Sequence, residues 1–215
     1  MSVNIAILIS GKHGRGSNMA AIAQACRTGQ IDGNIKIVIG NYEQSPALER
    51  ARSLGLKAET LSTPKPLADE TALDEYSRQM LKVLQTNNVD LICLAGYLLK
   101  VPDLVLHTFP GRITNIHNAL LPSFGGKGMY GKHVHQAVID YGVKFSGCTV
   151  HFVEESYDTG PIIVQRAVPV YDGDTVDDLA ARVLVAEHEA YPAAIELISK
   201  GKVELVGRKV RILSH

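Results

Sequence analysis

Continuous apolar runs alternate with segments of helical periodicity in the first part of the chain. The runs at Val3–Ile9, Ile35–Ile39 and Val89–Ala95 have the length of buried strands. Between them, apolar residues recur at helical spacing in the segments Met19–Cys26 and Leu73–Leu84. Strands that are apolar throughout and alternate with helices predict a parallel sheet with helices on both faces.

Short-range signals mark the start of the first of these helices and predict one further helix. Ser17 is placed to act as the N-cap of the first helix, directly after a glycine-rich turn. Ser45 and Pro46 open a second, shorter helix and Gly55 closes it. Proline first and glycine last is the usual asymmetry of a helix, so we expect an independent helix here.

The second part of the chain has a different pattern. Lys144–Val153 and Pro161–Val170 predict two strands joined by a turn, and Thr175–Asp178 resembles a capping box. A long helix is expected from there to Ser199, followed after Lys202 by a short hairpin. We therefore predict an α/β protein with an open, Rossmann-like sheet that is mostly parallel, with an antiparallel C-terminal part and helices on both faces.

Composition narrows the possible partners. The 215 residues include 22 basic and 22 acidic side chains without a clustered basic block, so nucleic acid is not an expected partner. Cys26, Cys93 and Cys148 are far apart and lie in apolar surroundings, which favours buried free thiols over a disulfide or metal site. No secretory signal and no apolar run of about 20 residues is present, so we expect a cytoplasmic protein that does not contact membranes.

Asn115 and His117 are the first candidates for catalysis. Residues two apart in an extended segment point to the same face, and an amide beside an imidazole suits a carbonyl oxygen that becomes negative during reaction. Asp158, in the turn between the two later strands, would orient the imidazole and favour its charged form. The alternative is structural: Asn ends a strand, His packs beneath a loop, and Asp-Thr-Gly forms an ordinary turn.

Gly16, Ser17 and Asn18 form a second candidate site at the start of the first helix. Unpaired backbone N–H groups and the helix dipole favour an anion there. The glycines at 11, 14 and 16 do not have the spacing of a dinucleotide-binding turn. An ordinary glycine turn before a helix remains the alternative.

These motifs, in this order, resemble the phosphoribosylglycinamide formyltransferase family over essentially the whole chain. That family transfers a formyl group from 10-formyltetrahydrofolate to the amine of 5'-phosphoribosylglycinamide (glycinamide ribonucleotide) in de novo purine synthesis. The stretches that carry the resemblance are Ile9–Gly11, Gly16–Asn18, Leu94–Tyr97, Asn115–Pro122, Val150–Val153, Asp158–Ile162 and Glu187–His188.

The resemblance implies a role for each candidate residue. Asn115, His117 and Asp158 would be catalytic, and the glycine turn at Gly16–Asn18 would bind the ribonucleotide phosphate. Glu187, on the apolar side of the last long helix, would bind the substrate's glycyl amine or ribose end. The alternative is a Glu that reaches solvent or pairs with Arg182 or His188. His135 would also contact the substrate, unless it is only a helix-entry histidine.

Folate binding is expected in two segments. One lies after the third apolar run and the other at the end of a later strand; their residues are Tyr97, Leu98, Leu99, Lys100, Val101, Val153, Glu154 and Glu155. The resemblance implies no metal, and the protein is expected to be a monomer or homodimer. It further implies one domain over residues 1–215, with a phosphate-binding half at 1–100 and a folate-binding and catalytic half at 101–215.

The chain departs from the family pattern at four places. The turn contains extra residues at Lys12–Arg15, Asn118 follows His117 where many relatives have proline, and the loop Ser123–Lys132 is longer and rich in glycine. Leu99 also stands where many relatives carry a basic residue. These changes make individual contacts of the loops less predictable than the chemistry.

Three other functions are alternatives. A formyltetrahydrofolate deformylase would hydrolyse the donor, but such enzymes carry an N-terminal regulatory domain, which we do not expect because the first strand starts at Val3. A phosphometabolite-binding module without catalysis would bind a sugar phosphate and ignore folate. Methionyl-tRNA formyltransferase would need a basic tRNA-binding domain. Formyl transfer to the ribonucleotide is therefore the favoured function.

Overall fold

The computed structural model describes residues 2–65 and 69–214. The chain divides into two compact units, Met1–Thr114 and Asn115–His215. Strand β5 (Ile113–His117) contains the boundary between them.

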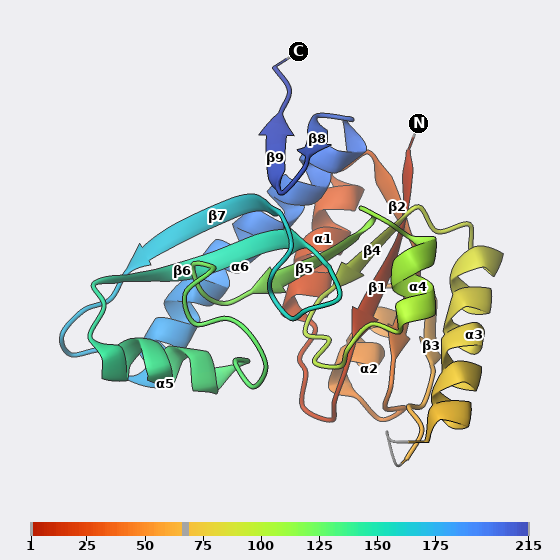
Figure 1. Cartoon of the computed structure of the whole chain (residues 1–215), viewed down its shortest axis with the longest axis horizontal. Helices are drawn as coiled ribbons and strands as arrows, with labels where there is room; N and C mark the ends of the chain where they lie inside the picture. The colour runs from red at the N-terminus through yellow and green to blue at the C-terminus, as the bar shows by residue number, and fades with distance from the viewer. Residues whose placement is uncertain (1, 66–68, 215) are drawn as a thin grey trace. The chain divides into compact units, whose positions relative to one another are not determined.

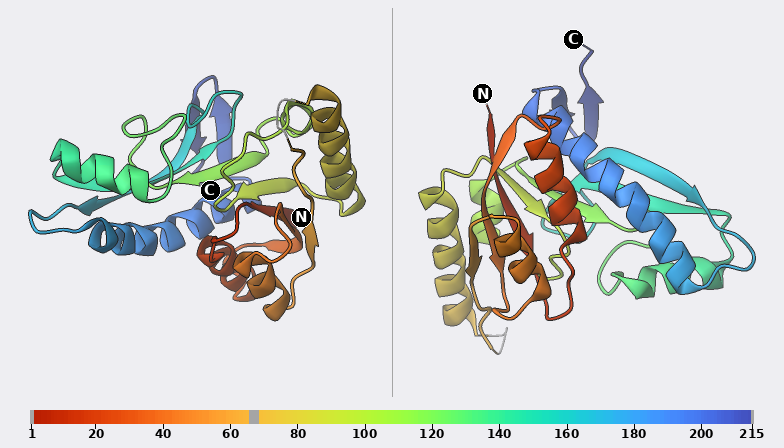
Figure 2. Two further views of the ribbon diagram at one scale, coloured as in Figure 1. Left: turned by 90° about the horizontal axis from the view of Figure 1, so that it is seen from below. Right: turned by 180° about the vertical axis from the view of Figure 1, so that it is seen from behind.

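The first unit contains a parallel sheet with helices on both faces (Figure 1). Pairing joins β1 to β2 and β4, and β2 to β3, all in parallel. Helices α1 and α2 lie on one face of these strands, and α3 and α4 lie on the other (Figure 2). The elements are β1 (Val3–Ile9), α1 (Ser17–Arg27), β2 (Gly33–Gly40), α2 (Pro46–Ser53), β3 (Ala58–Thr60), α3 (Glu70–Thr86), β4 (Leu91–Leu94) and α4 (Asp103–Thr108).

The three predicted strands and three predicted helices of this unit are confirmed. Side chains on both faces of β1 are fully buried, including Ile5, Ile7 and Leu8, as expected for a strand between two helical layers. The sequence did not reveal β3 and α4, which have only 3 and 6 residues. Such short elements contain too few residues for a periodic pattern to stand out.

The start of α1 differs from the prediction. Ser17 is the first helical residue and Gly16 is the N-cap, in the left-handed conformation with φ 62° and no side-chain capping bond. A Cβ at Gly16 would lie 3.0 Å from Met19 Cε and 3.1 Å from Ala47 Cβ. The prediction that Ser17 caps the helix is therefore wrong, because backbone conformation and close packing favour glycine there. Ser45, by contrast, is the N-cap of α2 as predicted.

The second unit combines an antiparallel strand pair with a long helix. Strands β6 and β7 pair in antiparallel fashion; α6 contacts both, and α5 contacts α6. The hairpin of β8 and β9 follows α6, as predicted. The elements after β5 are α5 (Lys132–Tyr141), β6 (Phe145–Phe152), β7 (Ile162–Pro169), α6 (Val176–Ser199), β8 (Val203–Val206) and β9 (Lys209–Ile212).

The predicted capping box begins α6. The Asp178 N–H donates to Thr175 Oγ1 at 3.2 Å, and the Thr175 N–H donates to Asp178 Oδ2 at 2.9 Å. These two bonds satisfy backbone donors that have no partner within the helix. Pro192 lies inside α6, which continues from Val176 to Ser199.

Hydrogen bonding orders the strands as β3-β2-β1-β4-β5-β6-β7. The sheet is mostly parallel and ends in the antiparallel pair β6–β7. This topology confirms the predicted fold class.

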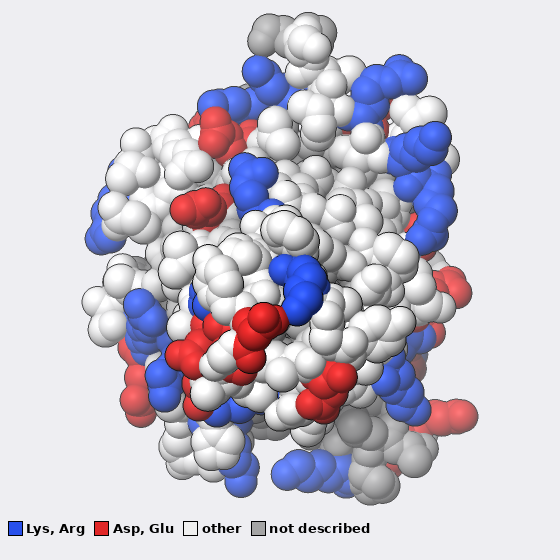
Figure 3. Space-filling view, turned by 90° about the vertical axis from the view of Figure 1, so that its left-hand side faces the viewer, with Lys and Arg blue, Asp and Glu red and all other residues white. Residues whose placement is uncertain are grey.

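Surface charge and the burial of the cysteines can be compared with the sequence-based expectations. Acidic and basic side chains are interspersed on the face shown in Figure 3. Cys93 and Cys148 are buried as predicted, whereas Cys26 is only half-buried, so the expectation that all three thiols are buried is wrong for Cys26. Among the described helices, none has the length and apolar character needed to cross a bilayer.

Candidate active site

The three predicted catalytic residues meet within the second unit. Asn115 and His117 lie two residues apart on β5, and Asp158 lies in the turn between β6 and β7. His117 Nδ1 is 3.6 Å from Asp158 Oδ2, and His117 is only 5% exposed. The structure thus brings together an amide, an imidazole and a carboxylate.

Asp158 is held by an unusual turn. Its φ of 56° is left-handed, a conformation that Asp tolerates better than most residues. The Gly126 N–H donates to Asp158 Oδ2 at 2.9 Å. A Cβ at Gly160 would lie 1.8 Å from the carbonyl oxygen of Phe152. Asp158 therefore belongs to a tight turn and also places its carboxylate beside His117.

His151 is a site residue that the sequence reasoning missed. Its Nε2 lies 3.6 Å from Asp158 Oδ1 and 3.2 Å from Asn115 Nδ2. The residue is 2% exposed and lies on β6. The available signal was a histidine within Val150–Val153, one of the stretches that resemble the family. The cluster therefore contains two histidines on one carboxylate.

The proton on His117 can be placed from its partners. His117 Nε2 is 2.8 Å from the carbonyl oxygen of Phe124. A carbonyl oxygen only accepts hydrogen bonds, so Nε2 carries a hydrogen and donates it. Nδ1 then faces Asp158, and a second proton on the ring would point at the carboxylate.

Burial and charge oppose each other in this cluster. Burial lowers the pKa of His117, and the charge of Asp158 raises it only in part, so the pKa is lower than usual. Burial raises the pKa of Asp158, but His151, His117 and the Gly126 N–H outweigh it and hold that pKa below its ordinary value. Asp158 thus favours the charged form of His117, as expected, but burial has the larger effect and the net shift of the His117 pKa is downward.

Asn118 links the catalytic strand to His135. Its Nδ2 lies 3.0 Å from the Gly131 carbonyl oxygen and 2.9 Å from His135 Nε2. Burial, together with the nearby His117, lowers the pKa of His135 to about 4, so His135 is neutral near pH 7. Its Nε2 accepts from Asn118, which leaves the hydrogen on Nδ1, a buried atom without a hydrogen-bond partner in the described part of the chain. His135 thus lies near the cluster, and its substrate contact stays a prediction.

Glu187 lies on the buried side of α6, as its spacing predicted. It is 9% exposed. Burial and the charge of Glu187 raise the pKa of Cys148 to about 12, which places the carboxylate toward β6. Arg182 binds Asp174 through two contacts of 2.6 and 2.8 Å. The binding role of Glu187 stays a prediction.

The predicted phosphate turn lies in the first unit, at the start of α1. The Gly11 N–H donates to Asn41 Oδ1 at 2.8 Å, and Arg50 Nη1 donates to the Arg15 carbonyl oxygen at 3.3 Å. Lys12 Nζ lies 5.1 Å from the ring centre of Tyr42. Hydrogen bonds to neighbouring segments thus hold the loop that contains Lys12–Arg15, and Lys12 makes a cation–π contact with Tyr42.

The predicted folate segment of the first unit is anchored by Ser10. Ser10 Oγ accepts from the Leu98 N–H at 2.8 Å. The Tyr97 hydroxyl is buried 3.2 Å from that of Tyr76. Lys100 Nζ forms an ion pair with Asp103 at 2.8 Å, so its charge is already engaged. In the second unit, the other predicted folate residues directly follow β6: Val153 is half-buried, and Glu154 and Glu155 are exposed.

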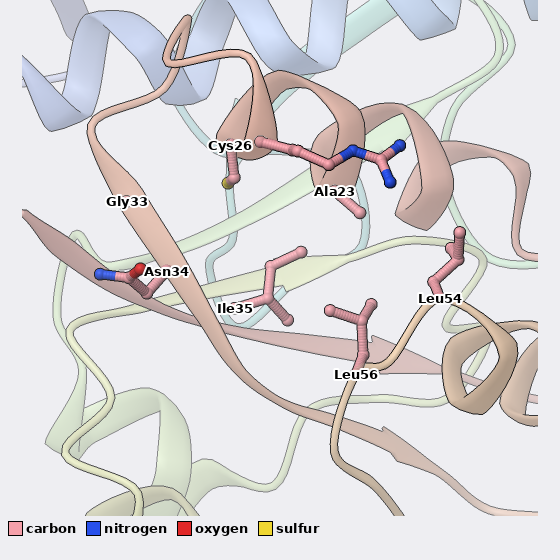
Figure 4. A pocket seen from close by; sticks show the side chains of 8 residues that line it. Ala23, Cys26, Gly33, Asn34, Ile35, Leu54 and Leu56 are labelled. Carbon is pink, nitrogen blue, oxygen red and sulfur yellow. The ribbon is translucent and has the colours of Figure 1, made fainter.

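A separate pocket of about 230 Å³ lies in the first unit. It is formed by the last turns of α1, the start of β2 and the segment after α2 (Figure 4). Burial raises the pKa of Cys26 in its wall to about 11. None of its lining residues is a predicted site residue. Among the residues that the structure describes, no group of three His, Cys, Asp or Glu side chains could hold a metal ion.

The fold and the amide–imidazole–carboxylate cluster define the class. A family model for formyl transferases matches residues 3–195. The chain belongs to the formyl transferase family, as the sequence motifs predicted.

Within this class, the chain is similar to phosphoribosylglycinamide formyltransferases. It is 41% identical over 201 residues to the chloroplastic enzyme of Arabidopsis thaliana, covering 93% of this chain and 66% of that protein. The Escherichia coli enzyme is 34% identical over 203 residues, covering 94% of this chain and 90% of that protein. The crystal structure of glycinamide ribonucleotide transformylase 1 from Symbiobacterium toebii has 43% identity and a TM-score of 0.88, covering 99% of this chain and 94% of that one. The chain thus spans just under two thirds of the Arabidopsis protein.

Proposed function

We propose that the protein transfers the formyl group of 10-formyltetrahydrofolate to the glycyl amine of 5'-phosphoribosylglycinamide, in purine biosynthesis. The observation that carries this proposal is the buried cluster in which His117 Nδ1 lies 3.6 Å from Asp158 Oδ2, beside Asn115. The family membership and the named relatives support it.

The chemistry assigns a task to each catalytic residue. The amine nitrogen attacks the formyl carbon and gives a tetrahedral oxyanion. Asn115 and His117 donate hydrogen bonds to this oxygen, and donors aimed at developing charge are worth most in a water-poor site. The amine then loses a proton with the assistance of Asp158, the bond between the formyl carbon and N10 breaks, and N10 takes up a proton.

The contact between His117 and Phe124 has a consequence for this reaction. The Nε2–H of His117 donates to the Phe124 carbonyl oxygen. An oxyanion must replace that acceptor before the same N–H can stabilise it. We propose that the loop containing Phe124 shifts when substrates bind, which its glycines permit.

The remaining assignments follow the resemblance. Backbone N–H groups at the start of α1 would bind the substrate phosphate, and buried Glu187 and neutral His135 would contact the rest of the ribonucleotide. The segment 97–101 and residues 153–155 would hold the folate. We propose one formyltransferase domain with a phosphate-binding half (1–100) and a folate-binding and catalytic half (101–215). The monomer or homodimer state stays a prediction. So does the cytoplasmic location, since the Arabidopsis relative is named chloroplastic.

The experiment that tests this function measures tetrahydrofolate release from 10-formyltetrahydrofolate, with and without 5'-phosphoribosylglycinamide. Release that depends strictly on the ribonucleotide is the expected result. Equal release without the ribonucleotide would identify a deformylase. Absence of release under both conditions would contradict an enzymatic function. Saturable binding of a non-reactive folate analogue would count against a phosphometabolite-binding module, which should ignore folate.

A further inference from the structure

The two ring nitrogens of His151 have different partners. Nδ1 lies 2.8 Å from the Phe152 carbonyl oxygen, which only accepts hydrogen bonds, so Nδ1 carries the hydrogen. In the neutral ring, Nε2 is then an acceptor. The group 3.2 Å from it is Nδ2 of Asn115, which can only donate.

This pairing fixes the orientation of the Asn115 amide. An amide side chain has a donor end and an acceptor end of almost the same shape, and only its hydrogen-bond partners decide which end points where. If the amide turned over, Oδ1 would face the lone pair of Nε2. One hydrogen of Nδ2 is thus used by His151, and the second remains available for a substrate oxygen.

The surroundings of His151 fix the position of its ring. Its side chain is buried, and its Nδ1–H is committed to the main chain. Asp158 Oδ1 lies 3.6 Å from Nε2, beyond hydrogen-bond distance, whereas Asn115 Nδ2 at 3.2 Å lies within it. His117 is the other titratable group near the ring. The charge of Glu187 on α6 raises the pKa of Cys148 on β6. Cys148 and His151 are three positions apart on this strand, so their side chains point to opposite faces.

We infer that His151 is a positioning residue: as a hydrogen-bond acceptor, it holds the Asn115 amide with its nitrogen presented to the reacting carbonyl. Its kinetic consequence rests on the proposed formyl transfer. His151 itself does not touch the reacting atoms in this scheme. A misdirected amide would place an oxygen, not a donor, beside the oxyanion, so turnover suffers more than substrate binding.

The kinetic test compares His151→Leu with His151→Gln. Leu fills a similar space without an acceptor, whereas the Gln side-chain oxygen can accept from Asn115. We expect His151→Leu to lower kcat by about 100-fold with KM changed only a few-fold. We expect the kcat of His151→Gln to be at least about tenfold higher than that of His151→Leu. Thermal unfolding of both variants checks that they are equally folded. Near-normal kcat in His151→Leu, or equal loss in both folded variants, would overturn the inference.

A second measurement does not depend on activity. Nitrogen-15 NMR of histidine-labelled protein, assigned with the His151→Gln spectrum, identifies which ring nitrogen carries the hydrogen. We expect Nδ1–H near neutral pH, and an Nε2–H tautomer would refute the orientation argument. A wild-type protein that shows the Nδ1–H tautomer but no formyl transfer would contradict the proposed function and still support the Asn115–His151 geometry.

Discussion

The Gly126 N–H donates to Oδ2 of Asp158, the oxygen that also faces His117. The glycine-rich loop and the catalytic carboxylate are therefore held together, 32 residues apart in sequence. Any substitution of Asp158 changes both the charge beside the imidazole and the anchor of the loop.

Asp158→Asn separates these two effects. Asn tolerates the left-handed φ of 56° as well as Asp does, and its side-chain oxygen still accepts from Gly126. We expect normal folding and a loss of turnover of at least about 100-fold, because the negative charge that assists proton transfer is gone. Steady-state kinetics and a thermal melt of the same preparation check this. A folded variant with a near-normal rate would remove Asp158 from the mechanism.

Gly160→Ala should disrupt the turn that carries Asp158. The added Cβ would lie 1.8 Å from the Phe152 carbonyl oxygen, so the backbone has to move. We expect the free energy of unfolding to fall by about 3 kcal/mol or more, measured by denaturant titration. Gly173→Ala is the matched control, because a Cβ there meets nothing within 4 Å. Similar stability of the two variants would contradict the close contact.

His135 gives the stability a defined pH dependence. Its pKa is about 4 in the folded protein and about 6.5 in the unfolded chain. Between these values the unfolded chain binds a proton that the folded protein does not, so stability decreases as the pH falls from about 6.5 to 4. Above this window the stabilisation is complete, and below it His135 adds no further change.

Thermal unfolding across this pH range provides the test. His117, whose pKa is also lowered, contributes in the same direction. The decrease should therefore be smaller, but not absent, in His135→Gln, whose side-chain oxygen can still accept from Asn118. An unchanged pH dependence in this variant would show that His135 is not the group responsible.

Asn118→Asp tests the link between β5 and α5. The carboxylate has the same shape but cannot donate to the Gly131 carbonyl oxygen or to His135 Nε2. We expect a loss of roughly 0.5–1.5 kcal/mol in the free energy of unfolding, the usual net contribution of a hydrogen bond that is exposed or half-buried. Asn118→Ser, which keeps one donor, should lose less. The link would be unimportant if both variants unfolded like the wild type.

Local patterns in the sequence determined much of the architecture. The apolar runs and helical spacing predicted β1, β2 and β4 with their helices, since burial on one or two faces imposes a fixed periodicity. The same rule placed Asn115 and His117 on one face of a strand, and the box at Thr175–Asp178 marked the start of α6. These features depend on neighbours within one helical turn or two strand positions, so they can be predicted from the sequence.

Only the tertiary structure decided the state of the site. His151 joins the cluster because β5, β6 and the turn after β6 meet in space, and no local spacing records such a distance. The lowered pKa of His117 reflects a competition between burial and the charge of Asp158. Desolvation depends on everything that packs around a group. The sequence by itself therefore determined which chemical groups could act, and the packing of distant segments decided their orientation and their charge.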